Sequence, residues 1–238
     1  MEDAVQKLIN VSGESVELEI PPGVFVPTEH GMIYARYLGI KPGDRVLDVG
    51  TGSGFLAILA AKKGGTVTAL DSDEESILCA QANAKCNDVE IEFIKSDLLD
   101  SMHQRSFDLA IANLPIEDLP NLSSEQLPPY RRHSLIGGVS GSDVTLRFLQ
   151  QIVECRHRTI VTNVLLVIGT ICDYKKIIRY AAENYKITWL AFIEVPTKPF
   201  VAEFLEFYKH QSEIGVMHVF RRDGVWRENK YVLLLTRK

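Results

Sequence analysis

The sequence predicts an α/β protein built on a doubly wound, mostly parallel sheet. From about residue 31 onward, short apolar segments rich in β-branched residues alternate with amphipathic segments. Strands that alternate with helical patterns of about 10–15 residues are typical of a parallel sheet with helices on both faces. A glycine-rich loop follows the first of these predicted strands. With 46% hydrophobic and 24% charged residues among 238, the composition is that of an ordinary globular protein.

The predicted elements follow in order. Strands are expected at residues 45–50, 66–71, 89–97, 107–114, 159–169 and 186–195. Helices are expected at 32–38, 55–63, 72–85, 146–154, 173–184 and 200–210. Ser72 and Glu75 have the spacing of a capping box and would begin the third helix. The tail is expected to form two strands, 215–220 and 230–236, with a turn at Asp223-Gly224, which would add an antiparallel edge to the sheet.

Several classes of protein are excluded by composition. No segment approaches the roughly 18 consecutive apolar residues of a membrane helix, and the acidic, polar first ten residues do not resemble a secretory signal. The four cysteines (Cys79, Cys86, Cys155 and Cys172) form no C-x-x-C pair. We therefore expect no zinc site or other metal site, no disulfide framework, no membrane association and a cytosolic location.

Charge is unevenly distributed along the chain. The net charge is −5, but residues 1–120 carry 9 basic and 20 acidic side chains, whereas residues 121–238 carry 17 basic and 11 acidic ones. The overall sign argues against a general polyanion binder, while the basic second half leaves a local acidic partner open.

The principal local motif is Asp48-Val-Gly50-Thr-Gly52-Ser-Gly54, between a predicted strand and a predicted helix. Glycines at every second position allow a tight turn and the close approach of a ligand at the carboxyl end of the strand. A dinucleotide fingerprint would need glycine where Phe55 stands, and a phosphate-binding P-loop would need a lysine that is missing here. The motif therefore favours another nucleoside-bearing ligand.

Aspartates at the ends of three predicted strands narrow the choice of ligand for this loop. Asp48 would repel a pyrophosphate but suits a ligand with an ammonium and a sulfonium group, which describes S-adenosylmethionine. Asp71 ends the next strand and could accept both ribose hydroxyls, and Asp97 could accept from the adenine amino group while Leu98 packs near the ring. Each aspartate alone could merely cap a helix or turn. Together they predict one cofactor site.

The segments VLDVGTGSGFLAI, ALDSD, KSDLLD and IANLP resemble those of class I S-adenosylmethionine-dependent methyltransferases over about residues 20–170. The resemblance implies a seven-stranded, Rossmann-like sheet in a methyltransferase domain at 31–238, after an N-terminal extension and cofactor-covering segment at 1–30. It implies that Asp48 and the glycine loop hold the methionine part, with Asp71 at the ribose and Asp97 near adenine. The full set of candidate cofactor contacts is Thr28, Asp48, Gly50, Thr51, Gly52, Gly54, Asp71, Ser72, Asp97, Leu98 and Asn113.

The candidate methyl-acceptor site is Asn113-Leu114-Pro115, after the fourth predicted strand. Methyl transfer from a sulfonium is an in-line displacement, so catalysis consists mainly of alignment and desolvation. The Asn113 side-chain oxygen and the Leu114 carbonyl could hold the N–H groups of a planar nitrogen, with Pro115 fixing the loop. Asn113 could instead be an ordinary turn residue before a proline, but its place after the fourth strand favours a catalytic role.

This loop resembles the N-P-P-Y motif of amino-methyltransferases. Gly137-Gly138-Val-Ser-Gly141 resembles the G-G-x-x-G segment of HemK/PrmC-like protein glutamine-N5 methyltransferases, and Val26-Pro27-Thr28-Glu29 loosely matches their cofactor-covering segment. Leu114 replaces the first proline of the motif, and Ile116 replaces its aromatic residue. N-L-P also resembles loops of tRNA guanine-N1 and rRNA adenine methyltransferases.

We therefore expect a cytosolic enzyme that methylates a nitrogen of a macromolecule. A glutamine amide of a protein such as a translation factor is favoured over an RNA base, and a non-catalytic cofactor-binding or partner-binding module is the alternative from another class. Other segments are weaker candidates. Tyr130–His133 is interpreted as a solvated basic turn, the aromatic stripe Phe200, Phe204, Phe207 and Tyr208 as core, and many of the basic residues from Arg221 to Lys238 as strand-edge charges.

Overall fold

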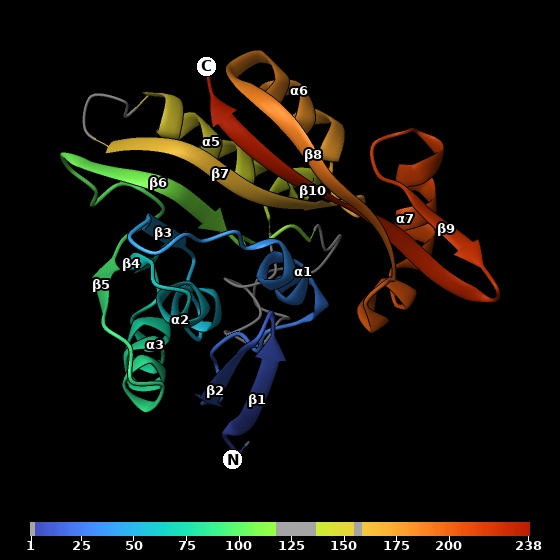
Figure 1. The fold of residues 1–238 in the computed structure, drawn as a ribbon. Helices are drawn as coiled ribbons and strands as arrows, with labels where there is room; N and C mark the ends of the chain where they lie inside the picture. Colours follow the sequence, from blue (N-terminus) through green and yellow to red (C-terminus); the bar gives the residue numbers. More distant parts are fainter. Residues whose placement is uncertain (1–2, 118–136, 155–158) are drawn as a thin grey trace.

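The computed structural model describes residues 3–117, 137–154 and 159–238, and its centre is a twisted sheet with helices on both faces (Figure 1). Within the described residues, seven strands follow one another in the order β5-β4-β3-β6-β7-β10-β8, with β9 paired to β10. Their bounds are β3 Arg45–Val49, β4 Thr66–Asp71, β5 Ile91–Lys95, β6 Arg105–Ala112, β7 Thr159–Gly169, β8 Tyr185–Pro196, β9 Val219–Arg222 and β10 Val225–Arg237. The predicted fold class is confirmed.

The antiparallel strand lies one place inside the sheet rather than at its edge. The strands from β5 to β7 pair in parallel, whereas β10 runs antiparallel to both β7 and β8. Val232, Leu233 and Leu235 of β10 are fully buried, as expected for a strand covered on both faces. The antiparallel edge itself is the short strand β9, which pairs with β10 across the predicted Asp223-Gly224 turn.

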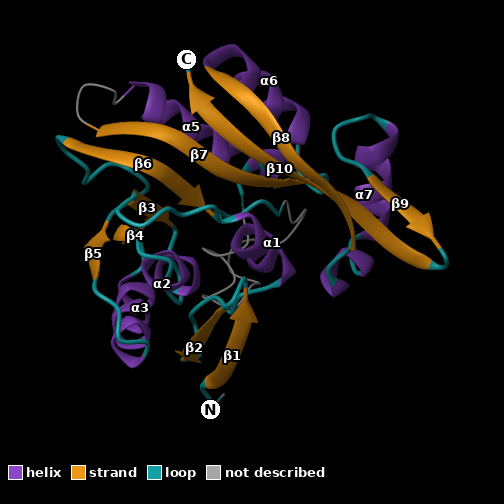
Figure 2. Cartoon of the chain, in the orientation of Figure 1, coloured by secondary structure: helices purple, strands orange, loops and turns teal. Residues whose placement is uncertain are grey.

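Helices lie on both faces of the sheet (Figure 2). Two hydrophobic cores form between the helices and the sheet. One face carries α1 (Glu29–Tyr37), α2 (Phe55–Lys62) and α3 (Glu74–Cys86), and the other carries α5 (Asp143–Glu154) and α6 (Tyr174–Asn184). The side chain of Asp73, rather than Ser72, caps α3, because Asp73 Oδ2 accepts from the Ser76 amide at 2.9 Å. The expected Ser72 capping box is therefore wrong by one residue.

A β-hairpin at the N-terminus was not predicted from the sequence. It consists of β1 (Val5–Val11) and β2 (Glu14–Ile20), which pair antiparallel across a turn in which Ser12 and Gly13 both have positive φ. Alternate residues of β2, namely Val16, Leu18 and Ile20, are buried in the same core as α1 and α2. The division of the chain at residue 30 stays a prediction.

The C-terminal part of the sheet extends to one side, where α7 (Leu205–Glu213) packs beside β9 (Figure 1). A 3₁₀ helix at Pro199–Ala202 precedes α7, so the predicted helix at 200–210 begins too early and ends too soon. Tyr208 is fully buried, and Phe204 and Phe207 pack against the same small core, which confirms these positions of the predicted stripe. In the described part of the chain, no helix is long and apolar enough to cross a membrane.

Candidate active site

The glycine loop connects β3 to α2 and is tied to the neighbouring strand. Gly50 and Gly52 adopt left-handed backbone conformations, with φ of 74° and 54°. The amides of Gly50 and Thr51 donate to the Leu70 carbonyl of β4 at 2.8 and 2.9 Å. These bonds fix the loop at the carboxyl ends of the strands, where doubly wound folds bind ligands.

Gly54 lies where two helices pack closely together. It precedes α2 with φ of 84°, and a Cβ on it would lie 3.0 Å from the Cβ of Ala80 in α3. Gly54 does not line the cavity described below. Its missing side chain allows α2 and α3 to approach each other, and its role as a cofactor contact stays a prediction.

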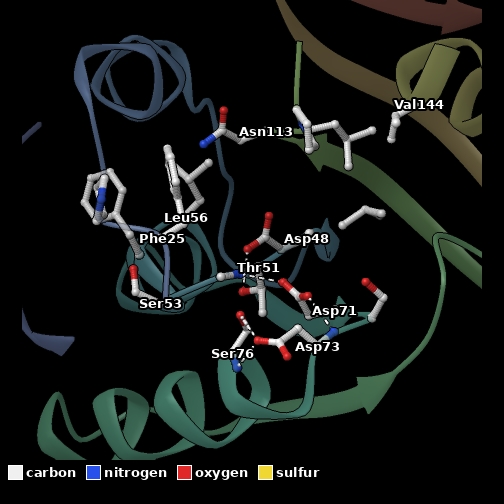
Figure 3. Close-up of a pocket in the computed structure, with 18 of the residues that line it drawn as sticks. Phe25, Asp48, Thr51, Ser53, Leu56, Asp71, Asp73, Ser76, Asn113 and Val144 are labelled. Carbon is white, nitrogen blue, oxygen red and sulfur yellow. Dashed lines mark hydrogen bonds between the residues drawn. The ribbon is translucent and has the colours of Figure 1, made fainter. Parts of the chain in front are cut away.

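Asp48 and Asp71 stand side by side at the ends of β3 and β4 (Figure 3). Asp48 is buried, and its Oδ2 accepts from Thr51 Oγ1 at 2.8 Å. Asp71 Oδ2 accepts from the Gly52 amide at 2.8 Å, and its Oδ1 accepts from the Asp73 amide at 3.0 Å. Burial raises the pKa of Asp48 to about 7, and it also raises the pKa of Asp71. Two poorly solvated carboxylates at one site form a local environment that attracts cations.

Asp97 is half-exposed and forms an ion pair with Arg147 of α5. Leu98, next to it, is buried with a positive φ of 50°. Arg147 contacts Asp97 through Oδ1, and no contact to Oδ2 appears among the described residues. This arginine was not identified from the sequence, since it lies on the polar side of an amphipathic helix.

One cavity of about 1170 Å³ joins these groups to the predicted acceptor loop. This volume is at the upper end for small-molecule sites, so it has room for more than a cofactor. Every predicted site residue except Gly54 lines it: Thr28, Asp48, Gly50, Thr51, Gly52, Asp71, Ser72, Asp97, Leu98, Asn113, Leu114 and Pro115. Pro22, Gly23, Phe25, Pro27 and Thr28 form part of its wall. There Thr28 Oγ1 is buried without a hydrogen-bond partner among the described residues.

The acceptor loop is held by the second glycine motif. A Cβ on Gly137 would lie 2.7 Å from the Pro115 carbonyl oxygen, and one on Gly141 would overlap the Ile116 carbonyl oxygen. The Gly137 amide donates to the Glu117 carbonyl at 2.9 Å. The glycines of G-G-x-x-G therefore allow this segment to pack directly against the backbone of the loop. Ile116 is buried in the core on the α5–α6 face.

Charged side chains that the sequence did not point to lie in and behind the cavity wall: Glu117 and Lys198 line the cavity, whereas Glu228 and Lys230 do not. Lys198, in the segment between β8 and α7, forms an ion pair with the buried Glu117. Lys230 Nζ lies 2.9 Å from Glu228 Oε2 in β10, and both side chains are buried. Beside them His30 of α1 is 6% exposed. Glu228 and Lys230 stand next to the apolar run 231–235, and this was the one signal that could have identified them.

The predicted segment Tyr130–His133 and Cys155 lie outside the described residues. Cys79, Cys86 and Cys172 are free thiols.

The strand order, the glycine loop and the paired carboxylates together define the architecture of an S-adenosylmethionine-dependent methyltransferase, and comparisons with known proteins agree. Residues 22–125 match the family described as "Methyltransferase small domain". A protein from Methanocaldococcus jannaschii, named as a protein N5-glutamine methyltransferase, is 30% identical over 140 residues, which cover 58% of this chain and 70% of the relative. The chain belongs to the class I S-adenosylmethionine-dependent methyltransferases and is an enzyme with S-adenosylmethionine as its cofactor.

Other relatives act on different macromolecules according to their names. Ribosomal protein L11 methyltransferase of Thermus thermophilus is 39% identical over 133 residues, covering 53% of this chain and 50% of the relative. Release factor glutamine methyltransferase of Koribacter versatilis is 35% identical over 147 residues, covering 57% of this chain and 52% of the relative. The chain thus spans about half the length of these two relatives.

Solved structures share the fold. The 16S rRNA N2 G1207 methyltransferase of T. thermophilus, solved with AdoMet and guanosine, aligns with a TM-score of 0.58 at 17% identity, covering 100% of this chain and 52% of the other. The tRNA m1G37 methyltransferase of M. jannaschii aligns with a TM-score of 0.56 at 15% identity, covering 100% and 56%. At these identities the likeness concerns the fold alone.

Proposed function

We propose that this enzyme transfers a methyl group to the side-chain amide nitrogen of a protein glutamine. The observation that carries the proposal is that Asn113, Leu114 and Pro115 line the same cavity as Asp48 and Asp71. A cofactor that occupies the aspartate end would direct its methyl group toward a planar acceptor held by the loop. The names of the M. jannaschii and K. versatilis relatives support the choice of a glutamine amide.

The cofactor fits the residues at the aspartate end. Asp48 and the loop from Gly50 to Gly52 would hold the methionine part, because a buried carboxylate stabilises a nearby ammonium and sulfonium. Asp71 would accept from the ribose hydroxyls, and Asp97 with Leu98 would contact adenine. Thr28 Oγ1, buried without a partner among the described residues, supports a ligand at the covering segment. S-adenosylmethionine supplies the electrophilic methyl carbon.

The acceptor loop would position the nitrogen that is methylated. The Asn113 side-chain oxygen and the Leu114 carbonyl would accept its N–H groups, and among the described residues no backbone amide donates to that carbonyl. The Leu114 side chain approaches the glycine loop, since a Cβ on Gly50 would lie 3.2 Å from Leu114 Cδ2. An apolar wall at that point excludes water from the displacement.

Substitution of Asn113 tests the proposal. We expect Asn113→Ala still to bind S-adenosylmethionine, by calorimetry, and at saturating cofactor to transfer methyl groups about 100-fold more slowly, as when an oriented polar group is removed. Asn10→Ala, an exposed substitution in β1, is the matched control and should retain full activity. Full transfer by Asn113→Ala would overturn the assignment of the loop.

The class of substrate is tested by labelling. Methyl-tritiated S-adenosylmethionine is supplied with the enzyme to an extract of cells that lack it, before and after ribonuclease treatment. We expect ribonuclease-resistant label in protein, which acid hydrolysis releases as methylamine. Label in RNA, with transfer that falls steeply as salt rises, would instead establish an RNA base methyltransferase.

A further inference from the structure

Helix α5 holds the loop that follows β5 through two side chains one turn apart. Arg147 forms an ion pair with Asp97. Gln151 accepts from the Leu99 amide at 3.0 Å through Oε1 and donates to Asp100 Oδ1 at 2.8 Å through Nε2. Residues four apart lie on the same side of a helix. One side of α5 therefore holds both ends of this loop.

The loop and α5 meet at the wall of the cavity. Arg147, Asp97 and Leu98 all line it, and Val144 lines it from the first turn of α5 (Figure 3). Leu98 is buried in the same core as Leu149 of α5, although its φ of 50° is unfavourable for a residue with a side chain. The contacts with α5 thus hold the loop in one particular conformation beside the cavity.

The ion pair occupies one of the two carboxylate oxygens of Asp97. Arg147 Nη2 contacts Oδ1, and no group among the described residues donates to Oδ2. The two side chains are 50% and 52% exposed, and ion pairs with such exposure contribute little to stability. A charge-assisted hydrogen bond nevertheless fixes the direction of a carboxylate. The pair is therefore better suited to orient Asp97 than to stabilise the fold.

We infer that Arg147 is a positioning residue that makes the cofactor site select adenine over a 6-oxopurine. It holds Asp97 so that Oδ2 accepts from the 6-amino group of adenine. This inference rests on the cofactor placement in the proposed function, in which Asp97 and Leu98 contact adenine. It does not depend on the identity of the methyl acceptor, because it concerns only the binding of the cofactor.

The selection follows from the hydrogen-bonding groups of the two bases. An ionised carboxylate only accepts hydrogen bonds, so it pairs with the 6-amino group of adenine but not with the 6-oxo group of hypoxanthine. Hypoxanthine carries its nearest N–H at ring position 1, so a carboxylate that is free to move could accept from that group instead. Arg147 prevents this movement by holding Oδ1. Without Arg147, the side chain of Asp97 can adjust to either base.

Calorimetry with two product analogues tests the inference. S-adenosylhomocysteine and S-inosylhomocysteine differ only in the base, where a 6-oxo group with its N1–H replaces the 6-amino group. We expect wild type to bind the adenosyl compound at least about tenfold more tightly, the value of one hydrogen bond to a charged group. We expect Arg147→Met to reduce this preference to about threefold or less, because the carboxylate is released. Its thermal unfolding should remain close to that of wild type.

Two further variants separate orientation from structure. Arg105→Met breaks the ion pair with Glu92, whose side chains are 40% and 46% exposed and do not line the cavity. It is the matched control and should keep the wild-type preference. Gln151→Ala loosens the same loop without removing a contact of Asp97. It should weaken the binding of both compounds by the same factor and leave their ratio unchanged.

The outcomes distinguish this inference from the cofactor placement on which it rests. A wild-type preference in Arg147→Met, with or without an equal weakening of both compounds, would overturn the role of Arg147. If Asp97→Ala loses the preference while Arg147→Met retains it, the contact of Asp97 with adenine stands and only the role of Arg147 is wrong. If Asp97→Ala retains the full preference, both assignments fail. Methyl transfer to glutamine is tested separately, by the labelling experiment.

Discussion

At the scale of single residues, Asp48 is the group whose protonation depends most directly on what lies beside it. Its carboxyl is buried at the end of β3, and the only hydroxyl bonded to it among the described residues is that of Thr51. Burial raises its pKa from 3.8 to about 7. A cationic ligand has the opposite effect, because it stabilises the carboxylate. Cofactor binding and deprotonation of Asp48 should therefore be coupled.

This coupling predicts a pH-dependent affinity for S-adenosylmethionine. Below about pH 7 the ligand-free carboxyl is largely protonated, so binding must release a proton, and affinity should fall by up to about tenfold per pH unit. Titration calorimetry between pH 5.5 and 8.5 in buffers of different ionisation enthalpy measures both the affinity and the released proton. In Asp48→Asn the affinity should be weak, and its dependence on pH should be lost. An affinity that is constant across this range in wild type would contradict the prediction.

The same raised pKa of Asp48 predicts that this side chain lowers the stability of the cofactor-free protein at neutral pH. A pKa that is higher in the folded state contributes stability below the unfolded value, and this contribution is lost as pH rises through the folded value. Without cofactor, Asp48→Asn should therefore be more stable than wild type, by up to ~4 kcal/mol for a shift from 3.8 to about 7. Thermal unfolding should show a difference that grows from about pH 4 to pH 7 and is constant above. Equal midpoints at pH 8 would exclude it.

At the scale of elements, the contact between the two loops of the acceptor end depends on glycine. Gly141→Ala would place a methyl group against the Ile116 carbonyl and would also strain a residue with φ of 70°. Gly224→Ala, at φ of 79° with open space around it, is the matched control for strain alone. We expect Gly224→Ala to cost about 1 kcal/mol and Gly141→Ala clearly more, with loss of transfer. Chemical denaturation and the labelling assay measure the two effects, and similar results for both variants would contradict this explanation.

The elements differ in how far the sequence predicted them. The strands 66–71 and 159–169 were predicted to the residue, because compact apolar runs bounded by turn signals leave little choice. The hairpin of β1 and β2 was missed, since its polar alternate residues and its Ser12-Gly13 turn were not combined into one pattern. Its burial depends on α1 and α2, which lie later in the chain.

The residues of the cavity also differ in whether local sequence patterns could predict them. Its glycine loop and carboxylates follow from local motifs, and the predicted residues other than Gly54 line one cavity. The packing of Gly54 against Ala80 depends on α3, which lies later in the chain. His30, Glu117, Lys198 and Lys230 come from four separate segments. Because no regular spacing in the sequence connects these residues, only the tertiary fold shows that they lie close together. The roles of the residues in the cavity remain predictions.

At the scale of the whole molecule, Asn83 of α3 and Asn87, which caps the C-terminus of α3, hold the N-terminal hairpin, and Asn83 connects it to the glycine loop. Asn83 accepts from the Glu19 amide at 2.9 Å and donates to the Ser53 carbonyl at 2.9 Å. Asn87 accepts from the Glu17 amide at 3.0 Å and donates to the Glu17 carbonyl at 2.7 Å. Both asparagines hold β2, but Asn83 alone of the two also holds the loop.

This difference predicts separable effects on stability and binding. Asn83→Ala and Asn87→Ala should each lower the free energy of unfolding by about 1–3 kcal/mol, because each leaves buried backbone groups unpaired. Asn83→Ala should also weaken cofactor binding, since the Ser53 carbonyl loses its partner, whereas Asn87→Ala should not. Calorimetry and thermal unfolding of both variants provide the comparison. Equal cofactor affinities would show that the link to the loop is without effect.

The hairpin therefore has a practical consequence for anyone who shortens or tags this protein. Strand β2 supplies apolar side chains to the core and, through Asn83, reaches the loop beside Asp48. Trimming the first 20 residues would expose α1 and α2 to solvent and release the backbone of the loop from one of its supports. An affinity tag is better fused to the C-terminus. Limited proteolysis near residue 20 should differ between the cofactor-bound and the cofactor-free protein.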